Sequence, residues 1–401
     1  MNRGYQKTLY ASYVGYITQA IVNNLAPLLF VIFQESFHIS IGQIGFLVTY
    51  NFAVQIIVDV LAARYAEGIG YRSCVVAAHI FSALGLVGLA AFPTFLWDPY
   101  VGLLLAVTIY AIGSGLLEVM INPIVQALPL DEKSGAMSLL HAFYCWGHAL
   151  VVILTTVFLH FVGSNFWRLL VILWAVLPVC NAVAFTRIPI RVLSEDTPSM
   201  PAGKLWGMKI FWLFVILMIC SGASEQAMSQ WASYFAERGL QVSKSMGDLL
   251  GPCLFAVFMG TSRTVYGIKG SKLPLVKFIG ASGVLCVASY ILAVAAPVPI
   301  LSLTGCALCG LSVGIMWPGV VSLAAEHCPQ GGTAMFALLA LAGDLGCSSG
   351  PSVVSGVSEL FGGELKAGLL AAILFPILLL IGIGMLRKIT KPGRKIENVS
   401  V

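Results

Sequence analysis

Long apolar stretches recur along the chain, and short segments rich in polar residues, glycine or proline separate them. A helix of roughly 20 apolar residues is long enough to cross about 30 Å of hydrocarbon. The pattern predicts about twelve membrane-spanning helices. Their expected extents are 8–34, 41–65, 73–93, 99–127, 135–161, 166–187, 207–236, 244–267, 273–296, 299–325, 333–359 and 365–387.

The longest polar interruption lies near the middle of the chain, at 188–206, and reads PIRVLSEDTPSMPAGKLWG. A polar segment of this length between apolar runs indicates a loop outside the membrane. We therefore expect an N-terminal six-helix bundle over 1–187, a cytoplasmic linker over 188–206, and a C-terminal six-helix bundle with a short tail over 207–401.

The two halves repeat one another weakly. Segment 122–143 aligns with 317–341, which places Pro123 on Pro318, and segment 33–45 aligns with 235–247. Repeats that are spaced by half the chain are typical of a duplicated bundle. The predicted fold class is an all-α membrane protein with its twelve helices in two pseudo-symmetric bundles.

The composition agrees with a membrane protein and excludes other classes. Hydrophobic residues make up 59% of the chain and charged residues only 10%, whereas a soluble protein carries about 25% charged residues. The 10 cysteines lie mostly within apolar runs, which indicates small buried side chains rather than disulfides. Cys306 and Cys309 lack a second pair or a nearby histidine, so we expect no metal site. We expect no cofactor and no nucleic-acid partner, because the net charge of +5 is dispersed.

The basic residues predict the orientation of the chain in the membrane. If both termini are cytoplasmic, all but four of the 22 Lys and Arg residues fall in the inner segments, and the exceptions are Arg168, Arg238, Lys244 and Lys366. This asymmetry follows the positive-inside rule. We expect a multi-pass protein of the plasma membrane that acts as a monomer in the lipid bilayer.

Three carboxylates lie within predicted spans: Glu118, Glu225 and Asp344. A charged side chain at the bilayer centre costs roughly 2.5–3.5 kcal/mol on insertion scales, so it usually faces a cavity or a partner. No Lys or Arg is expected at mid-span beside them, and burial then favours the protonated form. They are candidate proton-coupling groups, although each could instead be a neutral carboxyl that is hydrogen-bonded within the bundle. Asp59 and Arg263, at the inner ends of their spans, are candidate gating residues.

Other polar residues recur at helical spacing and predict a shared polar cavity. Such spacing places side chains on one face of a helix. The alternative is hydrogen bonding between helices, at roughly 0.6 kcal/mol for each bond. The candidate cavity residues besides Glu118 and Glu225 are Tyr16, Gln19, Asn23, Asn24, Asn122, His141, Tyr144, Gln226, Trp231 and Trp317.

The chemistry of this set favours a neutral substrate. The apolar face of a sugar ring stacks on indole, while its hydroxyls bond to amides, imidazoles and carboxylates. Phosphate esters and carboxylate substrates need Arg or Lys clamps, which the predicted spans lack at their centres. The residues therefore indicate a sugar or a sugar-like polyol.

Several segments carry a resemblance to known transporters. Twelve helices in two repeats with a cytoplasmic linker look like the major facilitator superfamily. Within it, VNNLAPLLF (22–30), GLLEVMINP (115–123) and LLHAFYCWG (139–147) resemble helices 1, 4 and 5 of the fucose:proton symporter family, and GASEQAMSQWASYF (222–235) resembles a helix 7 pattern of its sugar-transporting relatives.

The resemblance implies roles for particular residues. It makes Glu118 a carboxylate linked to proton and sugar, and Asn24 a polar contact from helix 1. The chain departs from the family at Pro27, where fucose symporters carry an aspartate, and at His141 and Tyr144, where they carry Gln and Asn. The segment 59–72 is a loose version of the superfamily's gating motif, with Asp59, Arg64 and Arg72.

The leading hypothesis is a secondary active transporter, not an enzyme, that imports a neutral sugar or polyol together with protons by alternating access. The sequence does not distinguish protons from sodium as the coupling ion. An alternative is a proton antiporter that expels cationic amphipathic compounds, although helix 5 lacks the Gly-Pro element typical of drug antiporters. A second alternative is a membrane sensor or scaffold that binds a ligand without transporting it.

Overall fold

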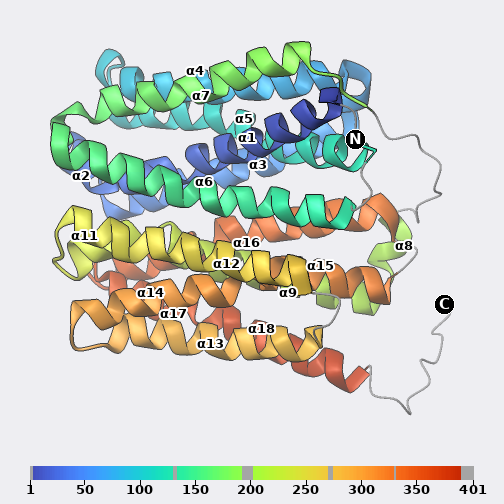
Figure 1. The fold of residues 1–401 in the computed structure, drawn as a ribbon. Coiled ribbons are helices and arrows are strands. Elements are labelled where there is room, and N and C mark those ends of the chain that lie inside the picture. Colours follow the sequence, from blue (N-terminus) through green and yellow to red (C-terminus); the bar gives the residue numbers. More distant parts are fainter. Residues whose placement is uncertain (1–2, 130–132, 192–201, 270–273, 329–330, 390–401) are drawn as a thin grey trace.

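The computed structural model of the chain describes residues 3–129, 133–191, 202–269, 274–328 and 331–389, and its long elements are helices that run side by side (Figure 1). The start of α1 and the end of α18 lie at the same end of the bundle, which we call the terminal end. The opposite end is called the far end.

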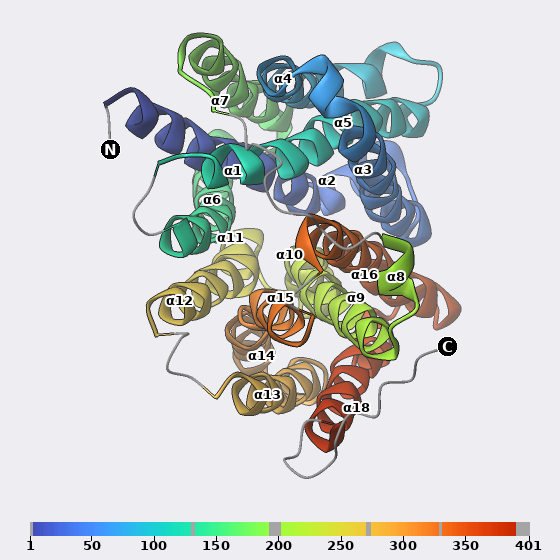
Figure 2. The same cartoon turned by 90° about the vertical axis from the view of Figure 1, so that its right-hand side faces the viewer.

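The first half of the chain, called the N half, forms one group of helices (Figures 1 and 2). Its elements are α1 (Arg3–Leu28), α2 (Phe30–Phe37), α3 (Ile41–Ile69), α4 (Tyr71–Phe95), α5 (Pro99–Gln126), α6 (Lys133–Val162), η1 (Ser164–Phe166) and α7 (Trp167–Arg187). Within it, α4 packs against α5 and α7, and α1 packs against α5 and α6. These contacts place the polar stripes of α1, α5 and α6 beside one another.

The second group, called the C half, begins after α8 (Ala202–Trp206), which falls inside the predicted linker. Its elements are α9 (Lys209–Ser229), α10 (Ala232–Tyr234), η2 (Phe235–Gly239), α11 (Lys244–Asp248), η3 (Leu249–Cys253), α12 (Leu254–Lys269), α13 (Leu275–Ala295), α14 (Pro299–Val313), α15 (Met316–His327), α16 (Gly332–Leu360), α17 (Leu365–Ala372) and α18 (Leu374–Ile389). The halves meet where α3 packs on α16 and where α6 packs on α12.

Length and hydropathy agree with the predicted spans. Ten helices of the described residues are long and apolar enough to cross a membrane, and α1 with α2 brings the number to eleven as a bent pair. The remaining predicted span, 244–267, is interrupted and consists of α11, the π-helical turn η3 and α12. The sequence pattern therefore located the spans but missed their breaks.

The expected single helix over 8–34 is wrong in one respect, because it is broken at Leu29 and bends there by 48°. Pro27 has no N–H group, so it cannot bond to the carbonyl of Asn23 four residues earlier. Gln230 of the C half donates to that carbonyl at 3.2 Å. Lys244 donates to the carbonyl of Leu28, at the end of α1, at 2.6 Å. The break thus supplies two backbone acceptors for the other half.

Further contacts between the halves lie toward the far end. Tyr234 donates to Gln34 Oε1 at 3.0 Å, and Arg238 forms an ion pair with Glu35. A third contact links Thr156 of α6 to the buried carboxylate of Asp248 at 3.3 Å. These bonds hold the two halves together at the far end.

The packing of α3 on α16 forms an antiparallel seam between the halves. At its far end an added β-carbon would meet Glu359 at Gly42 and Ser355 at Gly45, so glycine permits the close approach. Next along the seam, the hydroxyls of Thr49 and Ser352 lie 2.5 Å apart.

Candidate functional site

Glu118 of α5 is the centre of a polar cluster in the N half. Gln19 Nε2 on α1 donates to Glu118 Oε2 at 2.8 Å, and Tyr16 donates from its hydroxyl to Asn122 Oδ1 at 2.8 Å. The ring of His141 on α6 lies edge-on to that of Tyr16, with centroids 5.4 Å apart. Three helices therefore bring together residues that the sequence analysis singled out. We call Tyr16, Gln19, Glu118, Asn122 and His141 the Glu118 cluster.

The carboxylate of Glu118 has no ion-pair partner among the described residues, and its side chain is half-buried. Half-burial at mid-helix, facing amides, a phenol and an imidazole, is the environment of a group that solvent or a solute can still reach.

Asn23 and Asn24 lie farther along α1 and have different partners. Asn24 donates to the hydroxyl of Tyr144 at 3.2 Å. The side-chain oxygen of Asn23 accepts from Gln55 Nε2 on α3 at 3.2 Å, and the hydroxyl of Ser114 on α5 lies at the same distance. Asn23 is buried, and its side chain links α1 to α3 and α5. For this residue the structure agrees with the alternative interpretation, hydrogen bonding between helices. The sequence analysis did not select Gln55 and Ser114.

A small cavity adjoins Asn23. Its volume is about 20 Å³, and Asn51 and Gln230 also line it. The buried Oδ1 atom of Asn51 has no hydrogen-bond partner in the structure. A polar site of this size holds about one water molecule.

Glu225 of α9 corrects the prediction that the intramembrane carboxylates lack a cation. Arg263 Nη2 of α12 lies 2.9 Å from Glu225 Oε2, and both side chains are buried. Arg263 is six residues before the end of α12 at Lys269, but its long side chain reaches into the bundle. Arg263 therefore lies near the inner end of its helix, as expected, but it is paired with Glu225, and its gating role stays a prediction.

Two other candidates in the C half, Gln226 and Trp231, bond to partners outside the Glu118 cluster. Gln226 donates to Glu225 Oε1 at 3.4 Å and accepts from Gln230 at 3.0 Å. Trp231 is fully buried, donates from its indole nitrogen to the carbonyl of Pro351 at 3.3 Å, and packs on Phe30. In this structure it belongs to the core that joins the halves.

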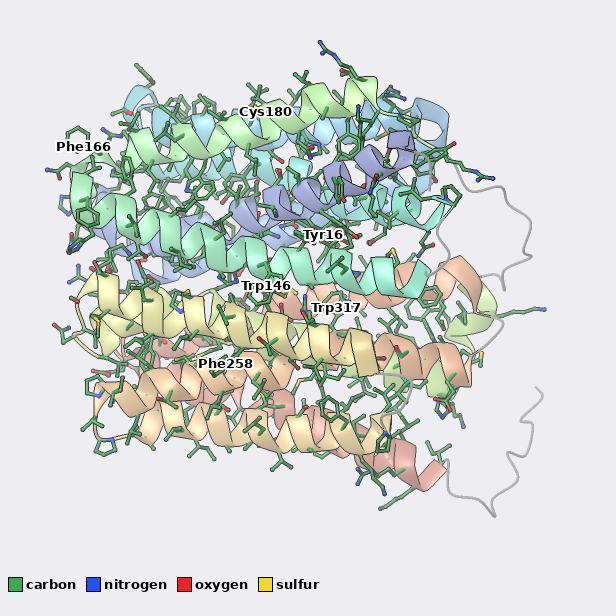
Figure 3. The ribbon with its side chains drawn as sticks, viewed as in Figure 1. Tyr16, Trp146, Phe166, Cys180, Phe258 and Trp317 are labelled. Atoms are coloured by element: carbon green, nitrogen blue, oxygen red, sulfur yellow. The ribbon has the colours of Figure 1, made fainter. Side chains whose placement is uncertain are left out.

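The half-buried Trp317 of α15 packs on Gly343 of α16, next to Asp344. Figure 3 shows Trp146 and Trp317 near the boundary between the halves, whereas Phe166 lies at the far end and Cys180 on the outer surface. Of the two candidate tryptophans, Trp231 is fully buried and Trp317 is half-buried.

Asp344 and Asp59 are close to one another, which the sequence analysis did not foresee. Asp59 on α3 and Asp344 on α16 lie on helices that pack against one another, close enough for their charges to interact. Asp344 is 5% exposed, and one oxygen of each carboxyl is buried with no donor among the described residues. The two residues belong to different halves.

The remaining gating candidates were Arg64 and Arg72. Arg72, in the first turn of α4, donates to the carbonyls of Phe185 at 2.6 Å and Ile188 at 2.8 Å, at the end of α7. These carbonyls are unpaired at a helix C-terminus, where a cation is favourable. Arg64 lies in α3, and its side chain falls outside the described part of the structure.

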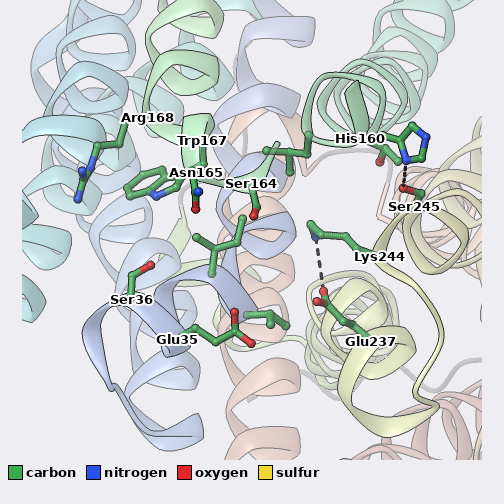
Figure 4. A pocket seen from close by; sticks show the side chains of 14 residues that line it. Glu35, Ser36, His160, Ser164, Asn165, Trp167, Arg168, Glu237, Lys244 and Ser245 are labelled. Carbon is green, nitrogen blue, oxygen red and sulfur yellow. Dashed lines mark hydrogen bonds and ion pairs between the residues drawn. The ribbon is translucent and has the colours of Figure 1, made fainter. Parts of the chain in front are cut away.

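One cavity lies at the far end, and none of the residues of the Glu118 cluster line it. It measures about 520 Å³ and opens between α2, α6 and α11 (Figure 4). Glu35, Arg168, Glu237 and Lys244 line it, and Lys244 lies 3.7 Å from Glu237. Its position is that of a vestibule, since the contacts between the halves separate it from the Glu118 cluster. Among the described residues, no group of three His, Cys, Asp or Glu side chains could hold a metal ion.

Comparisons with known proteins agree with this architecture. The sequence profile described as Major Facilitator Superfamily matches residues 12–351, which is well over half of the chain. No curated protein sequence matches.

Similar solved structures include two of FucP and one of another transporter. A variant of the E. coli fucose:proton symporter FucP is 18% identical, with a TM-score of 0.67 over 96% of this chain and 99% of that one. FucP in an outward conformation gives 16% identity and a TM-score of 0.67 over 96% and 99%. A bacterial homolog of the human lysosomal transporter Spinster, in an inward-facing and occupied conformation, is 14% identical to this chain. Its TM-score is 0.75 over 97% of this chain and 98% of that one.

At these identities the structures establish the fold, and the predicted class of twelve helices in two bundles is confirmed. The resemblance to the fucose:proton symporter family extends to the whole fold. The profile match establishes the family: the chain is a multi-pass membrane transporter that belongs to the Major Facilitator Superfamily.

Proposed function

We propose that the protein imports a neutral sugar or sugar-like polyol together with protons, by alternating access between its two halves. The observation that carries the proposal is the environment of Glu118. Its carboxylate is half-buried at mid-helix, accepts from Gln19 at 2.8 Å, and has no cation beside it among the described ion pairs. Such a group gains and loses a proton more readily than a buried ion pair does.

The surrounding side chains favour a neutral, hydroxyl-rich solute. The Glu118 cluster offers a phenol, two amides and an imidazole, all of which exchange hydrogen bonds with hydroxyl groups. Arg263, the buried Lys or Arg side chain of the described residues, is already paired with Glu225. An anionic solute would have to compete with that carboxylate. The relative named a fucose:proton symporter supports the same substrate class.

The contacts between the halves favour a particular state. Gln230, Tyr234 and Lys244 all bond to the N half on the far-end side of the Glu118 cluster. With the termini in the cytoplasm of the cell, as the basic residues predict, this arrangement is closed toward the outside. Import then requires that these bonds break so that solute can enter through the vestibule of Figure 4.

A solute screen in reconstituted vesicles tests the proposal. Vesicles that contain the protein are given an inward pH gradient, and proton uptake is followed while neutral sugars and polyols are added one at a time. We expect at least one of them to raise proton uptake and to accumulate inside. If none does, while sugar phosphates or organic anions do, the proposed substrate class is wrong.

The alternative of proton-coupled efflux is tested with the same protein in cells. An efflux pump for cationic amphipathic compounds lowers the accumulation of a cationic dye, whereas a sugar symporter leaves it unchanged. The ion pair between Glu225 and Arg263 removes one of the carboxylates that such a cation would need. We therefore expect equal dye accumulation in cells with and without the protein.

A further inference from the structure

The vestibule at the far end has walls from both halves. From the N half, α2, α6, η1 and α7 contribute to it, and from the C half η2 and α11 do (Figure 4). Its volume of about 520 Å³ falls within the range of about 300–1,000 Å³ that is typical of small-molecule sites. None of the residues that the sequence analysis selected for solute lines it. The vestibule is therefore a separate candidate site.

Two lining residues make bonds on the interior side of the vestibule. Lys244 donates to the carbonyl of Leu28 at 2.6 Å and lies 3.2 Å from Asp248 Oδ2. Thr156 of the opposite half donates to the same carboxylate oxygen at 3.3 Å. Asp248 is buried, so these bonds lie between the vestibule and the interior of the bundle. They have to break before a solute can pass from the vestibule to the Glu118 cluster.

The charges on the wall balance one another. Two carboxylates, Glu35 and Glu237, and two cations, Arg168 and Lys244, line the vestibule. An anion would meet the carboxylates, and a cation would meet Arg168 and Lys244, so either pays for a like charge nearby. Arg168 lies over the ring of Trp167, with its guanidinium carbon 5.2 Å from the centroid, and it takes part in none of the ion pairs of the described residues.

The other polar groups of the wall are neutral. Ser245 Oγ of the C half lies 3.2 Å from His160 Nδ1 of the N half (Figure 4). Hydroxyl, amide and imidazole groups all exchange hydrogen bonds with hydroxyls, which both donate and accept. A neutral compound with several hydroxyl groups therefore matches this wall better than an ion does. The neutral polar lining residues are Ser36, Thr156, His160, Ser164, Asn165 and Ser245.

We propose that the vestibule is a second binding site for a neutral polyhydroxy compound, and that a ligand bound there holds the halves together at the far end. N-half groups such as Asn165 and C-half groups such as Ser245 move apart when the halves separate. A ligand that bonds to both walls binds the closed arrangement more tightly, so it shifts the population toward that arrangement. The inference rests on the proposed function for the class of solute and for the separation of the halves.

This site makes the solute an inhibitor of its own import at high concentration. A ligand that binds only the closed arrangement, at ten times its dissociation constant, raises the ratio of closed to separated molecules about elevenfold. Uptake from the far-end side then passes through a maximum as the solute concentration rises.

Paramagnetic relaxation in NMR spectra of the ligand locates the site on the full-length protein. Lipid nanodiscs are used, because the headgroups of sugar-based detergents would compete. A spin label on an unnatural amino acid, which avoids the 10 native cysteines, is placed at Phe166, an exposed neighbour of two lining residues, or at Glu326, exposed near the terminal end. We expect glucose and sorbitol to relax faster with the first label only. No effect at Phe166, or equal effects from both labels, overturns the proposal.

The chemical class is tested with three sugars that share a ring and differ in charge. Glucose is neutral, glucuronate carries a negative charge and glucosamine a positive one. We expect glucose to show the largest relaxation from the Phe166 label. A larger effect for either charged sugar contradicts the assignment of a neutral ligand.

Arg168 supplies the matched pair of variants. It begins α7, and Arg187 ends the same helix and is exposed. Arg168→Met removes a charged donor from the wall and should raise the dissociation constant of glucose at least about tenfold. Arg187→Met should leave it unchanged. Equal dissociation constants for the two variants would show that the sugar is bound elsewhere.

A distance measurement tests the effect of the ligand on the halves. Spin labels at Trp97 of the N half and Leu360 of the C half report on the far end, and both positions are exposed. Tyr234→Phe, which lacks the bond to Gln34, is used to populate separated halves. Glucose should raise the share of the short distance, and Arg168→Met should reduce that response. A share that stays constant or falls with glucose overturns the proposal.

The binding measurements need no transport, so the inference and the proposed function fail separately. Binding near Phe166 without proton-driven uptake of any neutral solute would retain the site and reject the symporter. Proton-driven uptake of a polyol, with no relaxation from the Phe166 label, would retain the symporter and reject the site.

Discussion

Each half carries a glutamate inside an apolar helix, but the two glutamates have different bonding partners. In the N half, Glu118 accepts a hydrogen bond from Gln19 and has no cation among the described ion pairs. In the C half, Glu225 is paired with Arg263 at 2.9 Å and both are buried. The same side chain can therefore be a site of proton exchange in one half and part of a fixed ion pair in the other. The neighbouring helix decides which.

We expect the largest effect, a loss of stability, from removing one partner of the ion pair between Glu225 and Arg263. Arg263→Met or Glu225→Gln leaves one buried charge uncompensated, which costs about 3–5 kcal/mol. The double variant removes both charges and should recover most of that loss, as measured by thermal unfolding in detergent. Glu118→Gln serves as the control and should change stability far less. Losses that simply add in the double variant would show that the two residues act independently.

A cation beside Glu118 should form an ion pair with it, like the pair of Glu225 and Arg263 in the C half. Gln19 Nε2 lies 2.8 Å from Glu118 Oε2, so Gln19→Lys places an ammonium group there and keeps the carboxylate ionised. A gradient of one pH unit is worth about 1.4 kcal/mol per proton, or about tenfold accumulation. That accumulation should disappear in vesicles with Gln19→Lys.

The matched control at this position is Gln19→Met, which has a similar length and no charge. It should retain part of the accumulation, because the carboxylate can still take up a proton. Normal accumulation by the lysine variant would mean that Glu118 does not exchange the coupled proton.

A smaller effect is expected from the phenol of the cluster. Tyr16→Phe removes the hydrogen bond to Asn122, which is worth about 0.5–1.5 kcal/mol. If the cluster binds solute, the half-saturation concentration for exchange should rise about two- to tenfold. Tyr10→Phe alters an exposed residue of the same helix and should have no effect. Equal behaviour of the two variants would place the solute elsewhere.

Much of the fold follows from hydropathy, because a helix in lipid must bond its own backbone and present apolar side chains outward. The pattern could not reveal the break at Leu29. Pro27 signals a lost hydrogen bond, but whether a helix bends there depends on partners such as Gln230 and Lys244, which are about 200 residues away in the sequence.

The site was predicted in part for a similar reason. Periodicity correctly placed Gln19, Glu118 and their neighbours on facing sides of α1 and α5. It failed for Arg263, because the depth of a Cα atom does not give the reach of an arginine side chain. Asp59 and Asp344 belong to different halves, and no local pattern reports how two bundles dock.

The most direct test of the contrast between the halves is transport by Glu118→Gln in vesicles, measured in two ways. Glutamine cannot release a proton but keeps the shape of the site. We predict normal exchange of solute across the membrane without a gradient, and no accumulation when a pH gradient is imposed. Accumulation equal to that of the unaltered protein would contradict the assignment of proton exchange to the N half.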